Sequence, residues 1–405
     1  MGKNKRWNGY KSWSYLDPTS DFESYPLEKQ LNRFPEYDFG LSKDQEQRVQ
    51  EIVEKNIVIS LHDHLNVFPL EDITRPRQRE FKAFEGLAHS CLDAVFENGL
   101  NHYPTSDQAI NFLGMSQADY AHQDLVIPGL KVDDIIRARR ENRVAMVFSI
   151  EELSSIGTNL DMVDLYFGLG LRAAGLVYNQ SNQLGTGLNE NRDGGLTDLG
   201  YDVVKRMNKT GVIVDIAHCS DLSCLEAIEA SDKPVLISHR GSRELFNNSR
   251  MLPDEISLAC AQKGGIIAVE AAGFAPRTEE HPEASVECTL DHIKYLIDVV
   301  GVDHVGVGPD TFWGDHPHSY KEEGERRIPR PSDTRPRPLS APPKFDPYEL
   351  RIKTPPEHPY NKGLENPADI INIARGLVRD GYSDNEIAKV IGLNGLRLAR
   401  ECWPS

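Results

Sequence analysis

The sequence lacks the features that mark several common protein classes. Its six cysteines are scattered and include no C-x-x-C pair, so we predict neither a zinc ribbon nor a disulfide framework and expect reduced thiols. No stretch approaches the roughly 18 apolar residues of a membrane-spanning helix, and the amino-terminal MGKNKRWNGYKSW has no apolar signal core. We therefore expect a cytoplasmic protein with no membrane partner.

Positive charge is also scarce. The chain carries 45 Lys and Arg residues against 62 Asp and Glu, which gives a formal net charge of −17. Nucleic acids and anionic membranes attract basic surfaces, so this balance argues against both as partners. A small polar substrate fits the composition better.

The 405 residues are best explained as one decorated domain. Residues 1–45 are aromatic, charged and aperiodic, and we expect an extension that packs on a surface or stays mobile. The domain itself covers 46–405. Within it, 315–362 forms a Pro-rich insertion that is either a lid or a solvated loop, and 364–400 forms two closing helical stretches.

Between the amino-terminal extension and the Pro-rich insertion, β-branched runs alternate with amphipathic helical stretches, which is typical of parallel βα units. The pattern predicts a (β/α)8 TIM barrel of the α/β class. A helix over 196–211 that ends at Gly211 leads into one of the strands. The clearest strands cover 56–62, 144–151, 173–178, 212–218, 234–239, 265–270 and 304–309, with the eighth between 85 and 100.

Candidate metal ligands stand at the ends of four of these strands. Because a barrel gathers the carboxyl ends of its strands at one face, we expect the candidates to meet there. Residues two apart on a strand share a face, so His62 and His64 can both point inward while Asp63 points away. The candidates are His62, His64, Glu151, His218 and His239.

Imidazole and carboxylate ligands favour zinc, although manganese, iron or cobalt would also bind. Glu151 can bridge two cations, with His62 and His64 on one and the other two histidines on the second. A metal-bound hydroxide would then attack a carbonyl, because metal binding lowers the pKa of water. Asp310, which ends the strand HVGVGPD, would shuttle the proton; the alternative is that it caps the next helix.

These residues resemble the renal or membrane dipeptidases of the amidohydrolase superfamily from about residue 50 to 400. The resemblance implies a (β/α)8 barrel with two zinc ions that hydrolyses dipeptides, often with a D residue at the carboxyl side. It places the five candidate ligands at the metals and makes Asp310 the acid and base. Proteins similar to this one are often homodimers. The most similar segments are GLTDLGYDVVKRMNKTGVIVDIAHCSD, PVLISHRGSRELFNNSRMLPDE, DHIKYLIDVVGVDHVGVGPD and GYSDNEIAKVIGLNGLRLARE.

The resemblance also implies two substrate contacts. Arg250, eleven residues after His239, corresponds to an arginine that grips the substrate carboxylate, for which a guanidinium fork is well suited. Without the resemblance it would be read as a surface ion pair. Tyr178 stands where the family has a histidine near the scissile carbonyl. It either donates a hydrogen bond to a developing oxyanion or packs at the barrel rim.

One further departure concerns the first motif, where the family has His-x-Asp and this chain has His62-Asp63-His64. A neutral imidazole replaces a carboxylate, so we expect the first metal to be held less tightly or to be a stronger Lewis acid. The leading prediction is a metal-dependent dipeptidase. The alternatives are hydrolysis of an N-acyl amino acid, a cyclic amide or a lactone on the same scaffold, or a non-catalytic binding protein.

Overall fold

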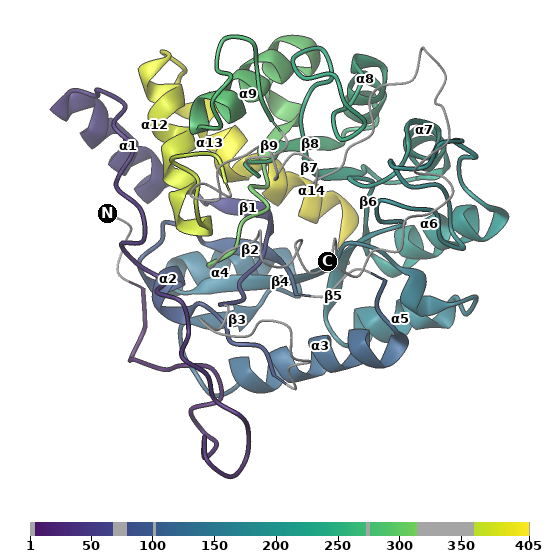
Figure 1. Ribbon diagram of the computed structural model, residues 1–405, viewed down its shortest axis with the longest axis horizontal. Helices are drawn as coiled ribbons and strands as arrows, with labels where there is room; N and C mark the ends of the chain where they lie inside the picture. Colours follow the sequence, from purple (N-terminus) through teal and green to yellow (C-terminus); the bar gives the residue numbers. More distant parts are fainter. Residues whose placement is uncertain (1–4, 68–78, 100–102, 273–275, 314–359, 405) are drawn as a thin grey trace.

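The strands form a parallel sheet that curls into a barrel, with helices around it (Figure 1). The computed structural model describes residues 5–67, 79–99, 103–272, 276–313 and 360–404. The strand order is β1-β2-β4-β5-β6-β7-β8-β9, with the short β3 paired on β4. The strands are β1 Ile59–Asp63, β2 Ala94–Asn98, β3 Val126–Pro128, β4 Val144–Ile150, β5 Leu171–Gly175, β6 Ile213–Asp215, β7 Leu236–Arg240, β8 Ile266–Val269 and β9 Val305–Val307.

Helices follow most of the strands, as a (β/α)8 barrel requires, and the predicted fold class is confirmed. Among the described residues, no helix is long and apolar enough to cross a membrane. The helices are α1 Lys43–Lys55, α2 Phe84–Ala88, α3 Ser106–Tyr120, α4 Val132–Glu141, α5 Asp161–Gly168, α6 Asp198–Thr210, α7 Asp221–Ala230, α8 Asp254–Gln262, α9 Val286–Val300, α12 Ile371–Arg379, α13 Asp384–Ala388 and α14 Asn394–Cys402.

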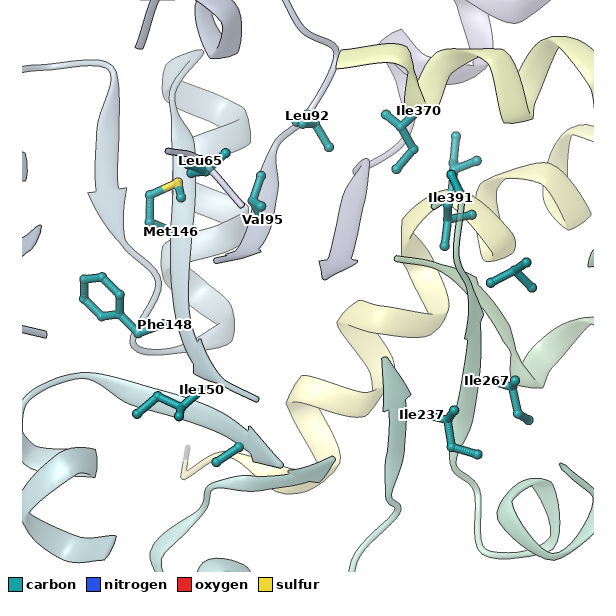
Figure 2. Packing of buried hydrophobic residues seen from close by; sticks show 14 of the residues in the cluster. Leu65, Leu92, Val95, Met146, Phe148, Ile150, Ile237, Ile267, Ile370 and Ile391 are labelled. Atoms are coloured by element: carbon teal, nitrogen blue, oxygen red, sulfur yellow. The ribbon is translucent and has the colours of Figure 1, made fainter. Parts of the chain in front are cut away.

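Alternation along the strands separates an inner from an outer apolar cluster. On β4, Met146 and Phe148 belong to the outer cluster beneath the helices (Figure 2). Ala145 and Val147 belong to the inner one. Side chains from helix α14, and Trp403 directly after it, join the inner cluster. The barrel interior is therefore filled by side chains.

All eight predicted strands are present, as is the predicted helix, which runs over Asp198–Thr210 and ends at Gly211 in the left-handed region. The prediction of a strand over 212–218 was too long, because β6 stops at Asp215. The Asp215 carboxylate accepts the backbone N–H of Ala217 (3.0 Å), which turns the chain out of the sheet. His218 consequently lies three residues beyond its strand.

The barrel closes between β9 and β1 through hydrogen bonds made around their carboxyl ends. The Asp310 N–H donates to the His62 carbonyl (3.1 Å), and the His64 N–H donates to the Thr311 carbonyl (3.0 Å). The buried Asp63 carboxylate accepts both the N–H (3.0 Å) and the hydroxyl (2.9 Å) of Thr311. Asp63 thus points away from the neighbouring histidines, as predicted, and ties the first strand to the last.

Shifts in strand register bring two histidines to the inside. Leu61 and Leu236 lie in the inner cluster, so strict alternation would turn His62 and His239 outward. The pairing register shifts between Ser60 and Asp63 on β1 and between Ile237 and Arg240 on β7. Irregularities of this kind re-aim side chains, and they are common beside active sites.

The described part of the amino-terminal extension packs on the barrel. Trp13 is buried, and its indole N–H donates to the Glu80 carbonyl (2.7 Å). Lys5 forms a buried ion pair with Asp93, the residue before β2 (2.9 Å). The predicted insertion at 315–362 lies outside the described residues except for its last three positions.

Gly308 tests how tightly the closure is built. A Cβ added there would lie 1.9 Å from the Ser238 carbonyl oxygen, a backbone atom that cannot move alone. We expect Gly308→Ala to lower the free energy of unfolding by at least about 2 kcal/mol. Gly114, in helix α3, has no atom within 4 Å of its ideal Cβ. Gly114→Ala should therefore be stabilising by about 0.5–1 kcal/mol. Urea midpoints measure both, and equal midpoints would contradict this description of the closure.

Candidate metal centre

Four side chains from strand ends around the barrel converge in a buried cluster. His62 Nε2 lies 3.3 Å from Glu151 Oε1 and 3.6 Å from Asp310 Oδ1. His64 Nε2 lies 3.1 Å from the same Asp310 oxygen and 3.6 Å from the same Glu151 oxygen. Donor atoms of all four lie within 4.8 Å of one another. The structure therefore brings together three predicted ligands and the predicted acid–base residue.

His218 and His239 lie beside this group. The His239 ring stacks on that of His62 with centroids 3.7 Å apart, and donor atoms of His62, His239 and Asp215 form a second close set. His218 Nε2 is 4.0 Å from Glu151 Oε2 and 2.9 Å from His239 Nε2. All five predicted ligands thus lie around one point: His62 lies near His64 and His239, and Glu151 lies near His64 and His218.

Hydrogen bonds at Nδ1 decide which ring nitrogen of three histidines faces this point. His64 Nδ1 lies 2.7 Å from the Asn98 carbonyl oxygen, and His218 Nδ1 lies 2.8 Å from Asn179 Oδ1. A carbonyl oxygen only accepts, so both Nδ1 atoms carry a hydrogen, and in the neutral form of each ring the lone pair is on Nε2. His239 Nδ1 similarly contacts Ser238 Oγ (2.6 Å). Ligand histidines are commonly oriented in this way.

The donor set fits a divalent cation on two observations. His62 Nε2 is buried among carboxylates yet makes no hydrogen bond of good geometry. Burial and the nearby charges of His62 and Arg250 hold the pKa of His239 well below its usual value, so its Nε2 faces that of His218 as a second acceptor at 2.9 Å. Two acceptors cannot hydrogen-bond each other, whereas a cation would satisfy both.

Electrostatics at the site favour positive charge. Burial alone would lower the pKa of His62, but the adjacent carboxylates of Asp310 and Glu151 raise it to about 10. Glu151 Oε1 is oriented by the Asn98 amide, which donates to it at 2.7 Å. Asp310 adopts φ 58°, which is uncommon for a residue other than glycine and typical of functional positions.

Arg250 reaches this region from behind the histidines. The side chain is 2% exposed, and its Nε and Nη2 form an ion pair with Glu270, which is fully buried (Nη2 to Oε2 3.0 Å). Nη2 also donates to the His239 carbonyl (2.8 Å), and Nη1 donates to the Ala217 carbonyl (3.2 Å) and lies against the His218 ring. The ion pair is thus internal rather than at the surface.

Aromatic rings cover two of the site histidines. Tyr178 is buried and packs on the His218 ring with centroids 4.2 Å apart, and Tyr103 meets Tyr178 edge-on at 6.0 Å. On the other side, Phe312 lies parallel to the His64 ring at 4.0 Å. Tyr178 therefore lies directly beside the candidate centre.

Sequence reasoning did not identify five polar residues that support this cluster. Three of them stand at the end of a strand or one residue past it, as Glu151 does, and the same criterion applied to AVFEN and IIAVE would have found two of these. The others interrupt or follow apolar runs and carried no distinct signal. These residues are Asn98, Glu270, Asn179, Asp215 and Ser238.

Comparison with known proteins agrees with the predicted family and fold. The family model described as membrane dipeptidase (peptidase family M19) matches residues 108–320. Dipeptidase tcpJ of Claviceps purpurea is 26% identical over 275 residues, covering 67% of this chain and 54% of that protein. The chain spans about half the length of the curated relatives it matches.

Solved structures share the architecture. An amidohydrolase from Pseudomonas aeruginosa superposes with a TM-score of 0.71 at 23% identity, covering 88% of this chain and 99% of that one. A metallopeptidase from Rhodobacter sphaeroides, liganded with a phosphinate mimic of L-Ala-D-Ala, gives a TM-score of 0.63 at 17% identity, covering 86% and 100%. At these identities the likeness supports the fold alone.

Asn98 offers a test of how the centre is supported. We expect Asn98→Ala to weaken binding of a divalent cation by about 10–100-fold, because Glu151 loses its orienting donor. Asn372, a buried asparagine in α12, donates to the Gly363 carbonyl (2.7 Å) and is the matched control. Both variants should lose about 1–3 kcal/mol of stability. Chelator competition should detect weaker binding for Asn98→Ala alone; equal affinities would contradict this role.

Proposed function

We propose that this chain, which belongs to the membrane dipeptidase family (peptidase family M19), is a metal-dependent dipeptidase. The observation that supports this most strongly is the convergence of imidazole and carboxylate donors from distant strands on one buried point. Three of the histidines have Nδ1 engaged by oxygen acceptors, so that Nε2 faces that point. A purely structural set of buried histidines would not need this common orientation.

The ligands we propose are His62, His64, Glu151, His218 and His239, with Glu151 between two cations. Zinc is the metal we favour, because imidazole and carboxylate donors suit it. When bound, such a cation lowers the pKa of water and polarises the scissile carbonyl. With His64 in place of the aspartate of related proteins, the site carries one negative charge less, so the first metal should be the more weakly held.

Asp310 is the proposed acid and base. Its Oδ1 lies within 3.6 Å of both His62 Nε2 and His64 Nε2, so a water molecule at the metals would be within reach. Asp310 would accept the proton of that water as the carbonyl is attacked. The C–N bond then breaks, and the same oxygen returns the proton to the leaving amine.

Tyr178 and Arg250 are the proposed substrate contacts. The Tyr178 hydroxyl would donate to the oxyanion that develops on the carbonyl oxygen. Arg250 would hold the terminal carboxylate of the dipeptide. Because Glu270 and the His239 carbonyl use Nε and Nη2, the substrate carboxylate would have to take the Nη1 donors that now face Ala217 and His218.

Turnover of dipeptides tests the proposal directly. We expect the purified protein to hydrolyse L,L or L,D dipeptides, to lose this activity on removal of metal by a chelator, and to regain it with zinc or manganese. His239→Ala should reduce kcat by at least about 1000-fold, because a metal ligand is lost. His122→Ala, an exposed histidine at the end of α3, is the matched control and should retain full activity.

The same assay includes N-acyl amino acids, cyclic amides and lactones. Turnover of one of these without any dipeptide hydrolysis would replace the proposed substrate class on the same scaffold. If the protein hydrolyses none of these substrates while zinc or manganese is bound, the enzymatic proposal is rejected.

A double variant separates the two contributions of Arg250. Arg250→Met alone leaves the buried Glu270 carboxylate without its ion-pair partner, which should cost about 3–5 kcal/mol of stability. Arg250→Met combined with Glu270→Met removes both charges, and much of the stability should return. The wild type should prefer a dipeptide over its carboxamide, whereas the double variant should lose that preference through a rise in KM.

Measured thermal midpoints establish that the double variant is folded before its kinetics are compared. If it discriminates between the acid and the amide as well as the wild type does, Arg250 does not bind the carboxylate, and its role is confined to the ion pair with Glu270.

A further inference from the structure

A buried carboxylate lies behind His239 and reaches it through one hydroxyl. Asp215 Oδ2 is 2.5 Å from Ser238 Oγ, and Ser238 Oγ is 2.6 Å from His239 Nδ1. All three residues are buried, with 1–7% of each exposed. Asp215 ends β6, and the other two are consecutive residues of the neighbouring strand β7. The proposed reaction assigns no role to Asp215 or Ser238.

Asp215 has carboxylate oxygens near His62 and His239, so it could be mistaken for another metal ligand. Both of its oxygens, however, already accept hydrogen bonds. Oδ1 accepts the backbone N–H groups of Ala217 (3.0 Å) and Ser238 (3.2 Å), and Oδ2 accepts the Ser238 hydroxyl. Three donors directed at one side chain indicate a fixed carboxylate whose partners belong to the protein.

The direction of the protons follows from these contacts. A carboxylate only accepts, so the single hydroxyl hydrogen of Ser238 points to Asp215. Ser238 Oγ must then accept in its contact with His239, which places the imidazole hydrogen on Nδ1. The lone pair of His239 therefore resides on Nε2, the atom that faces His218 Nε2 at 2.9 Å.

We infer that Asp215 and Ser238 are positioning residues that fix His239 in the Nδ1–H tautomer and thereby keep its Nε2 available to a cation. This inference rests on the proposed function and extends it, because it names residues that prepare a ligand without binding the metal. His64 and His218 obtain the same tautomer from a carbonyl and an amide oxygen, whereas His239 depends on a chain of two hydrogen bonds.

Asp215→Asn provides a test, because it should reverse the chain. The asparagine oxygen should stay where two backbone N–H groups donate, so its amide nitrogen takes the place of Oδ2 and donates to Ser238 Oγ. The Ser238 hydroxyl then turns to His239 and donates to Nδ1, which forces the hydrogen onto Nε2. Ser238→Ala breaks the chain and leaves both tautomers accessible.

We therefore expect a distinctive order of zinc affinities, measured by chelator competition. Ser238→Ala should bind zinc about 10-fold more weakly than the wild type, and Asp215→Asn should bind at least about 10-fold more weakly again. The double variant Asp215→Asn/Ser238→Ala should recover the affinity of Ser238→Ala, because the reversed donor is gone. A residue that merely supports the fold would not be rescued by a second buried substitution.

Histidine ¹⁵N chemical shifts of the metal-free proteins give a second readout. The wild type should show His239 with its hydrogen on Nδ1, Ser238→Ala a mixture, and Asp215→Asn the hydrogen on Nε2. If Asp215→Asn does not fold, the wild type and Ser238→Ala still decide the matter. An unchanged His239 tautomer in Ser238→Ala, or zinc binding by Asp215→Asn as tight as that by Ser238→Ala, would overturn the inference.

The inference and the proposed function fail in different ways. If the wild type binds zinc and hydrolyses dipeptides but the variants do not follow this order, only the role of Asp215 and Ser238 is rejected. If the tautomers respond as expected but no dipeptide is hydrolysed, the positioning role stands and the proposed substrate is rejected.

Discussion

Closure of the parallel sheet between its last and first strands is the constraint on which the rest of the structure depends. Asp63, fully buried at the end of β1, accepts two hydrogen bonds from Thr311, which lies 248 positions further along the chain. The backbones of His62 and Asp310 are joined at the same point. Because all strands are parallel, closing the sheet brings their carboxyl ends to one rim. His62, Glu151 and Asp310 meet there only if this contact holds.

The closure also explains how charged groups can be buried together. Glu151, Asp310 and Asp215 are nearly inaccessible, and isolated carboxylates in such surroundings would be costly. Donors from neighbouring strands hold two of them, the Asn98 amide at Glu151 and the Ser238 hydroxyl at Asp215, and the Asp310 carboxylate lies against the His62 and His64 rings. Behind the histidines, Arg250 and Glu270 form an ion pair of their own. The remaining acceptor atoms face one point, where positive charge is favoured.

Much of this arrangement could be predicted from the sequence, because apolar periodicity and polar strand ends are local signals. The eight strands and the cluster of His62, His64, Glu151 and Asp310 followed from them. The shifts of register on β1 and β7 could not be predicted, since they depend on which neighbour each strand pairs with. The partners of buried groups were missed for the same reason. Nothing in the sequence indicates that Glu270 meets Arg250 or that Ser238 links Asp215 to His239.

The most direct measurement of the central claim is anomalous diffraction from crystals grown with zinc. We expect anomalous peaks at the barrel rim about 2.0–2.2 Å from Nε2 of His62, His64, His218 and His239, with Glu151 oxygens at similar distances. Crystals that contain zinc elsewhere, or nowhere, while these five side chains keep their present positions, would contradict the existence of a metal centre in this protein.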